Sequence, residues 1–141
     1  MPDEFILAAE LNRDSLWLAD WPLCQLRVQN DVNYPWFVLV PRQPGLVETI
    51  DLSAADQQQL WFESAHLATF LREQFSAKKL NIAALGNMVP QLHVHHIVRY
   101  EEDLAWPAPV WGKHQARAYN EIELARLMQK LDGLNAPEKK Y

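Results

Sequence analysis

Apolar and polar residues alternate early in the chain in a way that predicts β-strands. In residues 24–29, apolar side chains occupy every second position, and this period of two indicates a strand with one polar face. Residues 14–21 are aromatic and apolar and predict an earlier strand or hairpin arm. After a turn at residues 30–33, an unbroken apolar run at 36–40 lies between two prolines. Such a run predicts a central strand that is buried on both faces.

The second half of the chain combines helical periods with two further strands. Ser53 is a candidate N-cap before an acidic first turn, and apolar residues then recur at helical spacing to about residue 76. Residues 117–132 show a second helical pattern, and residues 80–85 and 92–98 predict strands. Several strands around one long helix, without regular alternation, indicate an α+β domain with an antiparallel sheet. We expect the last four residues to form a frayed tail.

Length and composition agree with one domain that spans residues 1–141. The chain is 49% hydrophobic and has six tryptophans, which is enough to build a core without covalent cross-links. Cys24 is the single cysteine, so an intramolecular disulfide is impossible and nothing indicates an oxidising compartment. We therefore expect a cytoplasmic protein.

Charge and hydropathy exclude several classes of partner. The N-terminus is acidic where a secretory signal would be basic, and no uncharged apolar stretch reaches the roughly 20 residues that a spanning helix needs. We therefore expect no membrane association. The net charge of −5 repels a nucleic acid polymer at long range. A single nucleotide remains compatible with this charge, because a few local donors can hold its phosphates.

The chemistry of the chain is concentrated in a histidine cluster. On a strand, alternate side chains share a face, so Gln91, His93 and His95 are predicted to point the same way. An imidazole can act as a nucleophile, an acid or a metal ligand, according to what orients its second nitrogen. In one interpretation His93 attacks phosphorus; in another the pair binds zinc, which needs two more ligands. His66 and His114 can supply these only if the fold brings them near, and a structural role is the third interpretation.

Residues 86–99, GNMVPQLHVHHIVR, resemble the turn and catalytic strand of the histidine-triad (HIT) family. The family signature is His-φ-His-φ-His-φ-φ, where φ is apolar. The order of predicted elements within residues 15–112 matches the HIT fold. Residues 35–42 and 105–112 also resemble a bacterial subgroup of HIT-family hydrolases.

The resemblance implies a role for each matching residue. His93 matches the middle histidine, the nucleophile that forms a covalent nucleotidyl-imidazole, and His95 matches the third, which contacts the α-phosphate. Gln91 stands at the first position, where its amide can support a hydrogen bond but cannot carry a proton. Asn87 matches the polar residue of the turn that meets the phosphate. The candidate catalytic residues are therefore His93, His95 and Gln91.

Four other residues are candidates for binding substrate. In the family, a polar group on the earlier hairpin binds the ribose hydroxyls, and the nearest candidates here are Asn30 and Asp31. Arg99 is a candidate phosphate neighbour at the end of the catalytic strand. Trp111 is a candidate for closing the phosphate end of the pocket, or for contacting a second subunit.

The resemblance implies a nucleotidyl hydrolase or transferase that acts on the α-phosphate of a nucleoside phosphoramidate or a dinucleoside polyphosphate. It implies no cofactor, a small-molecule nucleotide as partner, and the homodimer that is common among HIT proteins. The chain departs from the family at Gln91, at Met88, where relatives carry Ser or Thr, and at Trp36 or Phe37, where an upstream His is absent. These departures favour a nucleotide-binding module with little turnover as the alternative, and a metal-binding protein is a third.

Overall fold

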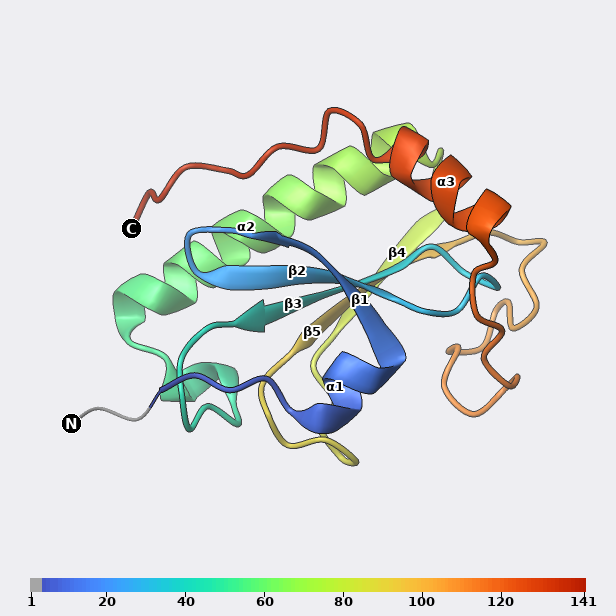
Figure 1. Cartoon of the computed structure of the whole chain (residues 1–141). Helices are drawn as coiled ribbons and strands as arrows, with labels where there is room; N and C mark the ends of the chain where they lie inside the picture. The colour runs from blue at the N-terminus through green and yellow to red at the C-terminus, as the bar shows by residue number, and fades with distance from the viewer. Residues whose placement is uncertain (1–3) are drawn as a thin grey trace.

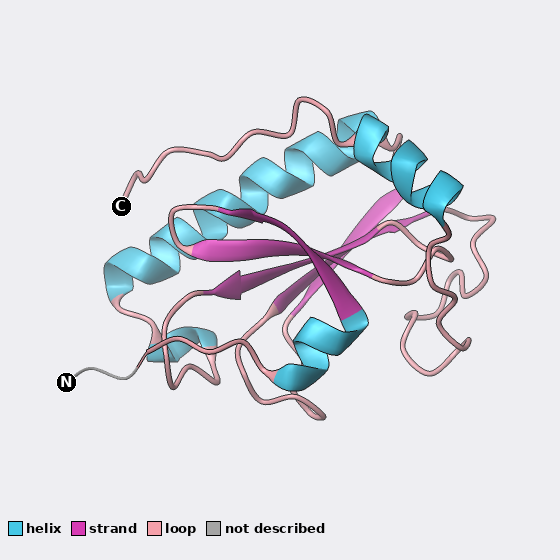
Figure 2. Ribbon diagram, viewed as in Figure 1, coloured by secondary structure: helices cyan, strands magenta, loops and turns pink. Residues whose placement is uncertain are grey.

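The computed structural model describes residues 4–141; residues 1–3, part of the acidic N-terminus, lie outside the described residues. Within the described part, five strands form one antiparallel sheet in the order β1-β2-β3-β5-β4 (Figures 1 and 2). The elements in chain order are α1 (Ala9–Asp14), β1 (Ser15–Asp20), β2 (Cys24–Gln29), β3 (Trp36–Pro41), the 3-10 turn η1 (Thr49–Asp51), α2 (Ala54–Gln74), β4 (Lys79–Ala83), β5 (Val94–Arg99) and α3 (Glu121–Lys130). The predicted α+β class is confirmed.

The sheet has a different environment on each of its faces. Phe37 and Leu39 of β3 pack in one apolar cluster with residues of α2. The residues that alternate with them, Trp36 and Val38, belong to a second cluster on the opposite face, together with Leu11. Every residue of β3 is buried, as the unbroken apolar run predicts for a central strand.

The long helix forms where the apolar period predicts it. The Ser53 side chain accepts a hydrogen bond from the backbone N–H of Asp56 at 3.1 Å and caps α2. Leu60, Leu67 and Leu71 are fully buried along one side of the helix. This stripe holds α2 against the sheet.

Several elements differ from the sequence prediction. β4 ends at Ala83 rather than at residue 85, and α3 begins at Glu121 rather than at residue 117. The short helix α1 was not expected, because its six residues are too few to show a helical period. β5 begins at Val94 rather than at Leu92, since the Leu92 N–H donates to the carbonyl of Leu46 and so leaves the sheet ladder.

The C-terminal residues form a docked segment, so the prediction of a frayed tail is wrong. The segment runs beside α2 in Figure 1. The Gln59 side-chain oxygen accepts from the backbone N–H groups of Lys140 and Tyr141, and its NH₂ group donates to the carbonyl of Glu138. A buried amide in the second turn of α2 therefore holds the end of the chain.

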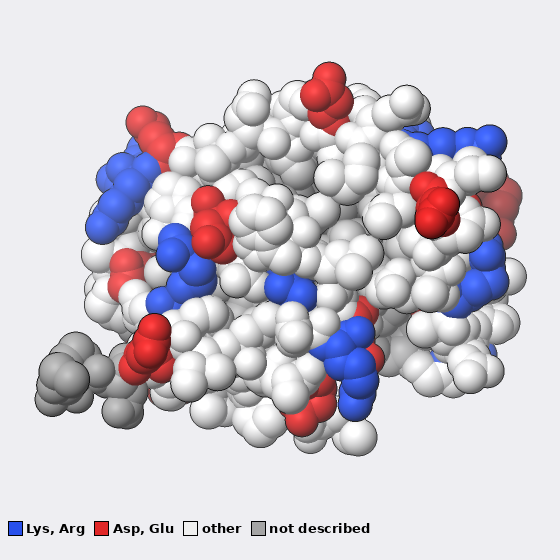
Figure 3. Space-filling model, viewed as in Figure 1, with Lys and Arg blue, Asp and Glu red and all other residues white. Residues whose placement is uncertain are grey.

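The surface is mixed in charge. On the face shown in Figure 3, basic and acidic side chains are interspersed rather than gathered by sign. Across residues 4–141, no helix is both long enough and apolar enough to cross a membrane.

Candidate active site

The antiparallel pairing of β5 directs its histidines to opposite faces of the sheet. His95 pairs with Val38 of β3 and with Ala83 of β4. It therefore shares a face with Val38, away from α2. His93 lies just before the strand on the same side, and the two imidazole centroids are 4.9 Å apart in an edge-to-face arrangement.

Both rings open into a cavity of about 240 Å³. Its walls come from α1, the ends of β2 and β3, the loop before β5 and the loop after it. The lining residues are Glu10, Leu11, Asp14, Gln29, Trp36, Leu85, Gly86, Asn87, Met88, Val89, His93, His95 and Trp111.

The hydrogen bonding of His93 leaves one nitrogen available for reaction. Its Nδ1 atom lies 2.6 Å from the backbone oxygen of Gln91. A carbonyl oxygen can only accept, so Nδ1 must carry the proton. In the neutral ring the lone pair is then on Nε2, which gives His93 the electronic arrangement of a nucleophile.

The proton of the His95 ring lies on the other nitrogen. The indole N–H of Trp36 donates to His95 Nδ1 at 2.9 Å, and an indole can only donate, so the proton of the neutral His95 ring lies on Nε2. Burial, followed by the neighbouring charges of His93 and His96, lowers the pKa of His95 to about 3. At neutral pH, His95 is therefore an uncharged hydrogen-bond donor.

Trp36 has a role that the sequence did not reveal. Sequence comparison with the family pattern marked Trp36 or Phe37 only as the place where a histidine is absent. The structure shows that Trp36 orients His95 and that its ring also packs edge-on against Trp111, with centroids 5.8 Å apart. The contact depends on the β3–β5 register, which the amino-acid pattern alone does not supply.

His96 points to the other face and belongs to the core. Its Nε2 atom lies 2.7 Å from the Ser64 hydroxyl of α2, and its Nδ1 atom lies 3.1 Å from the backbone oxygen of Val94. Burial lowers the pKa of His96 to about 4, although the bond to Val94 opposes this shift. His96 therefore has a structural role.

The Gln91 side chain does not line the cavity of the two rings, and it is bonded to the N-terminal segment instead. Because β5 begins at Val94, strand alternation does not extend back to Gln91. Its side-chain oxygen accepts from the backbone N–H of Ala8, and its NH₂ group donates to the carbonyl of Ile6, both at 2.8 Å. The amide is engaged by the N-terminal segment.

Two of the predicted binding residues, Asn87 and Trp111, line the cavity. The Asn30 and Asp31 side chains lie outside it, because they accept hydrogen bonds from the backbone N–H groups of Tyr119 and Arg117, respectively. Gln29, the residue before Asn30, reaches the cavity instead. The alternation of residues 24–29 already placed Gln29 on the polar face of its strand, and this signal could have identified it.

Arg99 also lies away from the cavity, in a buried ion pair. Its guanidinium lies 2.8 Å from Asp103 and donates to the Asn81 side chain and to the carbonyl of Ala108. Burial alone would raise the pKa of Asp103, but the bonds from Arg99 and from backbone N–H groups lower it to about 2. Arg99 therefore fixes the loop after β5 instead of contacting phosphate.

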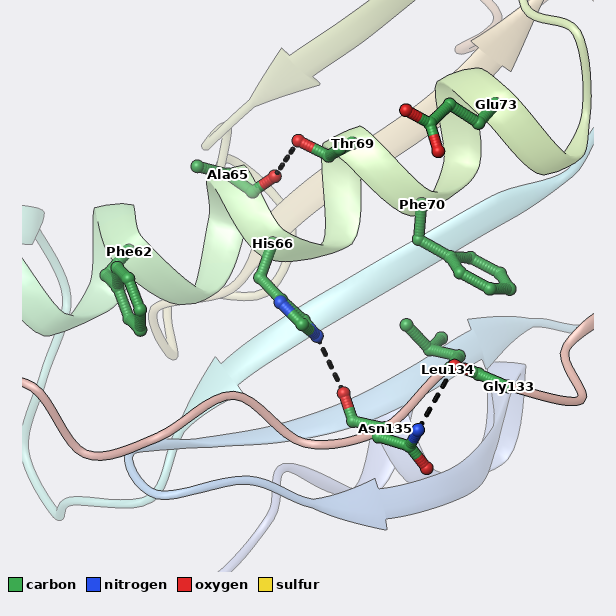
Figure 4. Close-up of a pocket in the computed structure, with 9 residues that line it drawn as sticks. All are labelled: Phe62, Ala65, His66, Thr69, Phe70, Glu73, Gly133, Leu134 and Asn135. Atoms are coloured by element: carbon green, nitrogen blue, oxygen red, sulfur yellow. Dashed lines mark hydrogen bonds between the residues drawn. The ribbon is translucent and has the colours of Figure 1, made fainter.

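The two histidines that a zinc site would need lie elsewhere. His66 lines a separate groove of about 440 Å³ beside α2, where it donates to the backbone oxygen of Asn135 at 2.7 Å (Figure 4). His114 donates to the carbonyl of Leu104. Among the described residues, no three His, Cys, Asp or Glu side chains are grouped to hold a metal ion.

Comparison with known proteins decides the family. A family model described as HIT domain matches residues 10–102, a range that includes both cavity histidines. The chain belongs to the HIT family. Among curated proteins none matches this HIT protein.

Solved structures of bacterial histidine triad proteins are similar to this HIT protein over almost its whole length. One from Marinobacter aquaeolei VT8 has a TM-score of 0.91 and 46% identity, over 94% of this chain and 96% of that chain. One from Bradyrhizobium japonicum has a TM-score of 0.90 and 44% identity, over 93% and 98%. One from Sinorhizobium meliloti 1021 has a TM-score of 0.89 and 40% identity, over 93% and 97%. Membership in the HIT family supports a nucleotide-related function.

Proposed function

We propose that this HIT protein is a nucleotidyl hydrolase or transferase that acts on the α-phosphate of a nucleoside phosphoramidate or dinucleoside polyphosphate. The observation that supports the proposal is that the Nδ1 atoms of two imidazoles in one cavity have opposite hydrogen-bonding roles. His93 has its proton fixed on Nδ1 by a carbonyl, and His95 has its proton fixed on Nε2 by an indole. One ring is thus prepared to attack phosphorus and the other to donate to a phosphoryl oxygen.

The first step is attack of His93 Nε2 on the α-phosphorus. The new N–P bond forms as the bond from phosphorus to the leaving group breaks, and the leaving group departs with the electron pair and takes a proton from water. The ring then carries a positive charge, which the Gln91 carbonyl stabilises through Nδ1–H. The product of this step is a nucleotidyl-His93 intermediate.

In the second step a water oxygen attacks the same phosphorus and loses a proton. The N–P bond breaks, its electron pair returns to Nε2, and a nucleoside monophosphate is released. An acceptor other than water would give transfer instead of hydrolysis. Division of one displacement into two is the advantage of a nucleophilic side chain.

His95 stabilises the charge that develops on the phosphoryl oxygens. Because its pKa is about 3, it donates as a neutral imidazole and does not titrate near neutral pH. Loss of one preorganised donor of this kind costs roughly 10²–10³ in rate in other enzymes. We assign His95 that role, with Trp36 holding its ring.

The rest of the cavity suits a nucleoside. The carboxylates of Glu10 and Asp14 and the amide of Gln29 offer acceptors for ribose hydroxyl groups. Leu11 and Leu85 offer apolar contacts for a base. Sites of this kind combine an apolar lining with a few polar groups that set orientation.

A nucleotide-binding module with little turnover is the second candidate. The observation that favours it is Gln91, since an amide replaces the first imidazole of the family signature and its side chain is bonded to the N-terminal segment. Binding and turnover therefore need separate measurements.

A rapid-quench experiment tests the proposal. The protein is mixed with an adenosine phosphoramidate labelled at phosphorus, quenched at alkaline pH, and digested for mass spectrometry. We expect an acid-labile adduct on His93 and release of AMP, with both abolished by His93→Ala and unchanged by the control His114→Ala. AMP binding by calorimetry without product formation would favour the module, and turnover by His93→Ala equal to that of the parent would refute the mechanism.

A further inference from the structure

The N-terminal segment, residues 4–8, lies across the side of the molecule that holds the cavity. Figure 1 shows it passing the chain that leads into β5 before it enters α1. Phe5, Leu7 and Ala8 pack against the apolar cluster that contains Trp36. The two hydrogen bonds from Gln91 join this segment to a residue more than 80 positions away in sequence.

We propose that Gln91 is a positioning residue that fastens the N-terminal segment and α1 as one wall of the substrate cavity. This inference rests on the proposed function, and it assigns to Gln91 control of substrate affinity rather than a part in bond breaking. The side-chain amide fixes the position of this wall, and the position of the wall determines how tightly the substrate binds.

α1 depends on this connection because it is weak as an isolated helix. It has six residues, and helices of such length are unstable in water without tertiary contacts. Its N-cap residue is Ala8, whose methyl group cannot accept a hydrogen bond from a backbone N–H. The Gln91 oxygen accepts from the N–H of Ala8 and thus fixes the start of the helix from the loop before β5.

The position of α1 decides the shape of the cavity. Glu10, Leu11 and Asp14 are three of its lining residues and come from this one helix. Leu11 is buried in the same cluster as Tyr34 and Val110. Movement of α1 would therefore remove the acceptors that face a bound nucleoside and admit water beside the histidines.

The backbone and the side chain of Gln91 have separable effects. Its backbone oxygen orients His93, and any amino acid at position 91 retains that oxygen. Its side chain holds residues 6–8. Substitution of the side chain is therefore expected to weaken binding while the nucleophile keeps its tautomer.

The test measures affinity and chemistry separately in Gln91→Ala. Loss of the two hydrogen bonds that hold this wall predicts that the Kd for AMP and the KM rise about tenfold. The single-turnover rate at saturating substrate and its pH profile are expected to stay within about twofold of the parent, since the His93 contact is retained. Hydrogen exchange of residues 4–14 in the free protein is expected to become faster.

A second variant removes the other partner of one bond. Ala8→Pro deletes the donor N–H, and the Ala8 φ of −55° is compatible with proline. If Gln91 acts through this contact, the effects of Ala8→Pro and Gln91→Ala on the AMP Kd are less than additive. Gln58→Ala, an exposed glutamine on α2, is the control and is expected to leave the AMP Kd unchanged.

The outcomes separate this inference from the proposed function. A fall in the single-turnover rate with unchanged Kd would overturn it and make Gln91 part of the chemistry. Unchanged hydrogen exchange, or fully additive effects in the double variant, would also overturn it. Absence of turnover in the parent, together with a tenfold weaker AMP Kd in Gln91→Ala, would reject the enzyme and retain the role of Gln91.

Discussion

At the scale of single residues, the site gives two identical side chains different properties through their partners. His93 and His95 are two positions apart and both line the cavity. A carbonyl fixes the proton of one, and an indole fixes the proton of the other. The chemistry of each imidazole therefore depends on the atom that is hydrogen-bonded to its Nδ1.

Trp36→Phe tests this dependence directly. The variant keeps the aromatic packing against Trp111 but removes the N–H that fixes His95, so both neutral tautomers of His95 become populated. We expect kcat/KM to fall by about tenfold, because the donor faces the phosphate only part of the time. Nitrogen NMR of His95 would report the tautomers.

The matched control is Trp17→Phe. Trp17 is 57% exposed, and its indole donates to Asp20 at the C-terminal end of β1. Its kcat/KM is expected to equal that of the parent. An unchanged rate in Trp36→Phe would contradict the role of the indole.

His96 predicts a pH dependence of stability. Its pKa falls from 6.5 to about 4 in the folded protein, so the unfolded chain binds more protons between these values. The stabilisation is present above pH 6.5 and is lost as the pH falls toward 4. Between pH 8 and pH 5, His96 alone should lower the free energy of unfolding by about 2 kcal/mol.

Urea unfolding of the parent and of His96→Gln at both pH values measures this contribution. The variant is expected to be less stable at pH 8, because glutamine cannot keep both hydrogen bonds of the ring. Its loss of stability on acidification should be smaller than that of the parent by about 2 kcal/mol. Equal losses would show that His96 titrates alike in the folded and unfolded chain.

At the scale of elements, the sequence predicted those whose signal is local. The alternation in residues 24–29, the apolar run before Pro41 and the leucine period of α2 each predicted an element close to its observed position. The end of β5 was predicted in the same way, but its start was not, because Leu92 bonds to Leu46.

The parts that could not be predicted depend on contacts between distant residues. The N–H of Ala8, the residue before α1, receives its partner from Gln91, so nothing in the six residues of the helix indicates that it is stable. Glu10 and Asp14 were missed as lining residues for the same reason. Asn30 was chosen in place of Gln29 from the resemblance to the family, although the alternation of residues 24–29 placed Gln29 on the polar face of its strand.

The N-cap of α2 gives a prediction at this scale. Ser53→Ala removes the acceptor for the Asp56 N–H, and loss of such a cap costs about 1 kcal/mol of protein stability. Denaturant unfolding should show this decrease with an unchanged m-value. Substitution by Asp, which can also cap, is expected to restore stability, and a value for Ser53→Ala equal to the parent would contradict the capping role.

At the scale of the whole molecule, the sheet separates the histidines of the cavity from the apolar cluster around α2, and the C-terminal segment lies alongside α2 (Figure 1). Gln59 holds this segment through hydrogen bonds to Glu138, Lys140 and Tyr141. Phe62 adds an edge-to-face contact with Tyr141. The end of the chain is therefore joined to the N-terminal half of its longest helix.

Gln59→Leu tests this connection. The apolar side chain keeps a similar volume inside the helix interface but offers no acceptor to the tail. Trypsin is expected to cleave after Lys139 or Lys140 several times faster than in the parent, as followed by intact mass. Exposed Gln58→Leu, one residue away, serves as the control, and equal cleavage rates would contradict docking through Gln59.

The pairing of His95 with Val38 and Ala83 means that odd and even positions along β5 decide which imidazole faces the cavity. A shift of β5 by a single residue would bring His96 to the open side and bury His95 against the leucines of α2. Loss of one residue from the loop before Val94 would impose such a shift unless the loop absorbed it. The length of that loop therefore determines the cavity as much as the imidazoles themselves do.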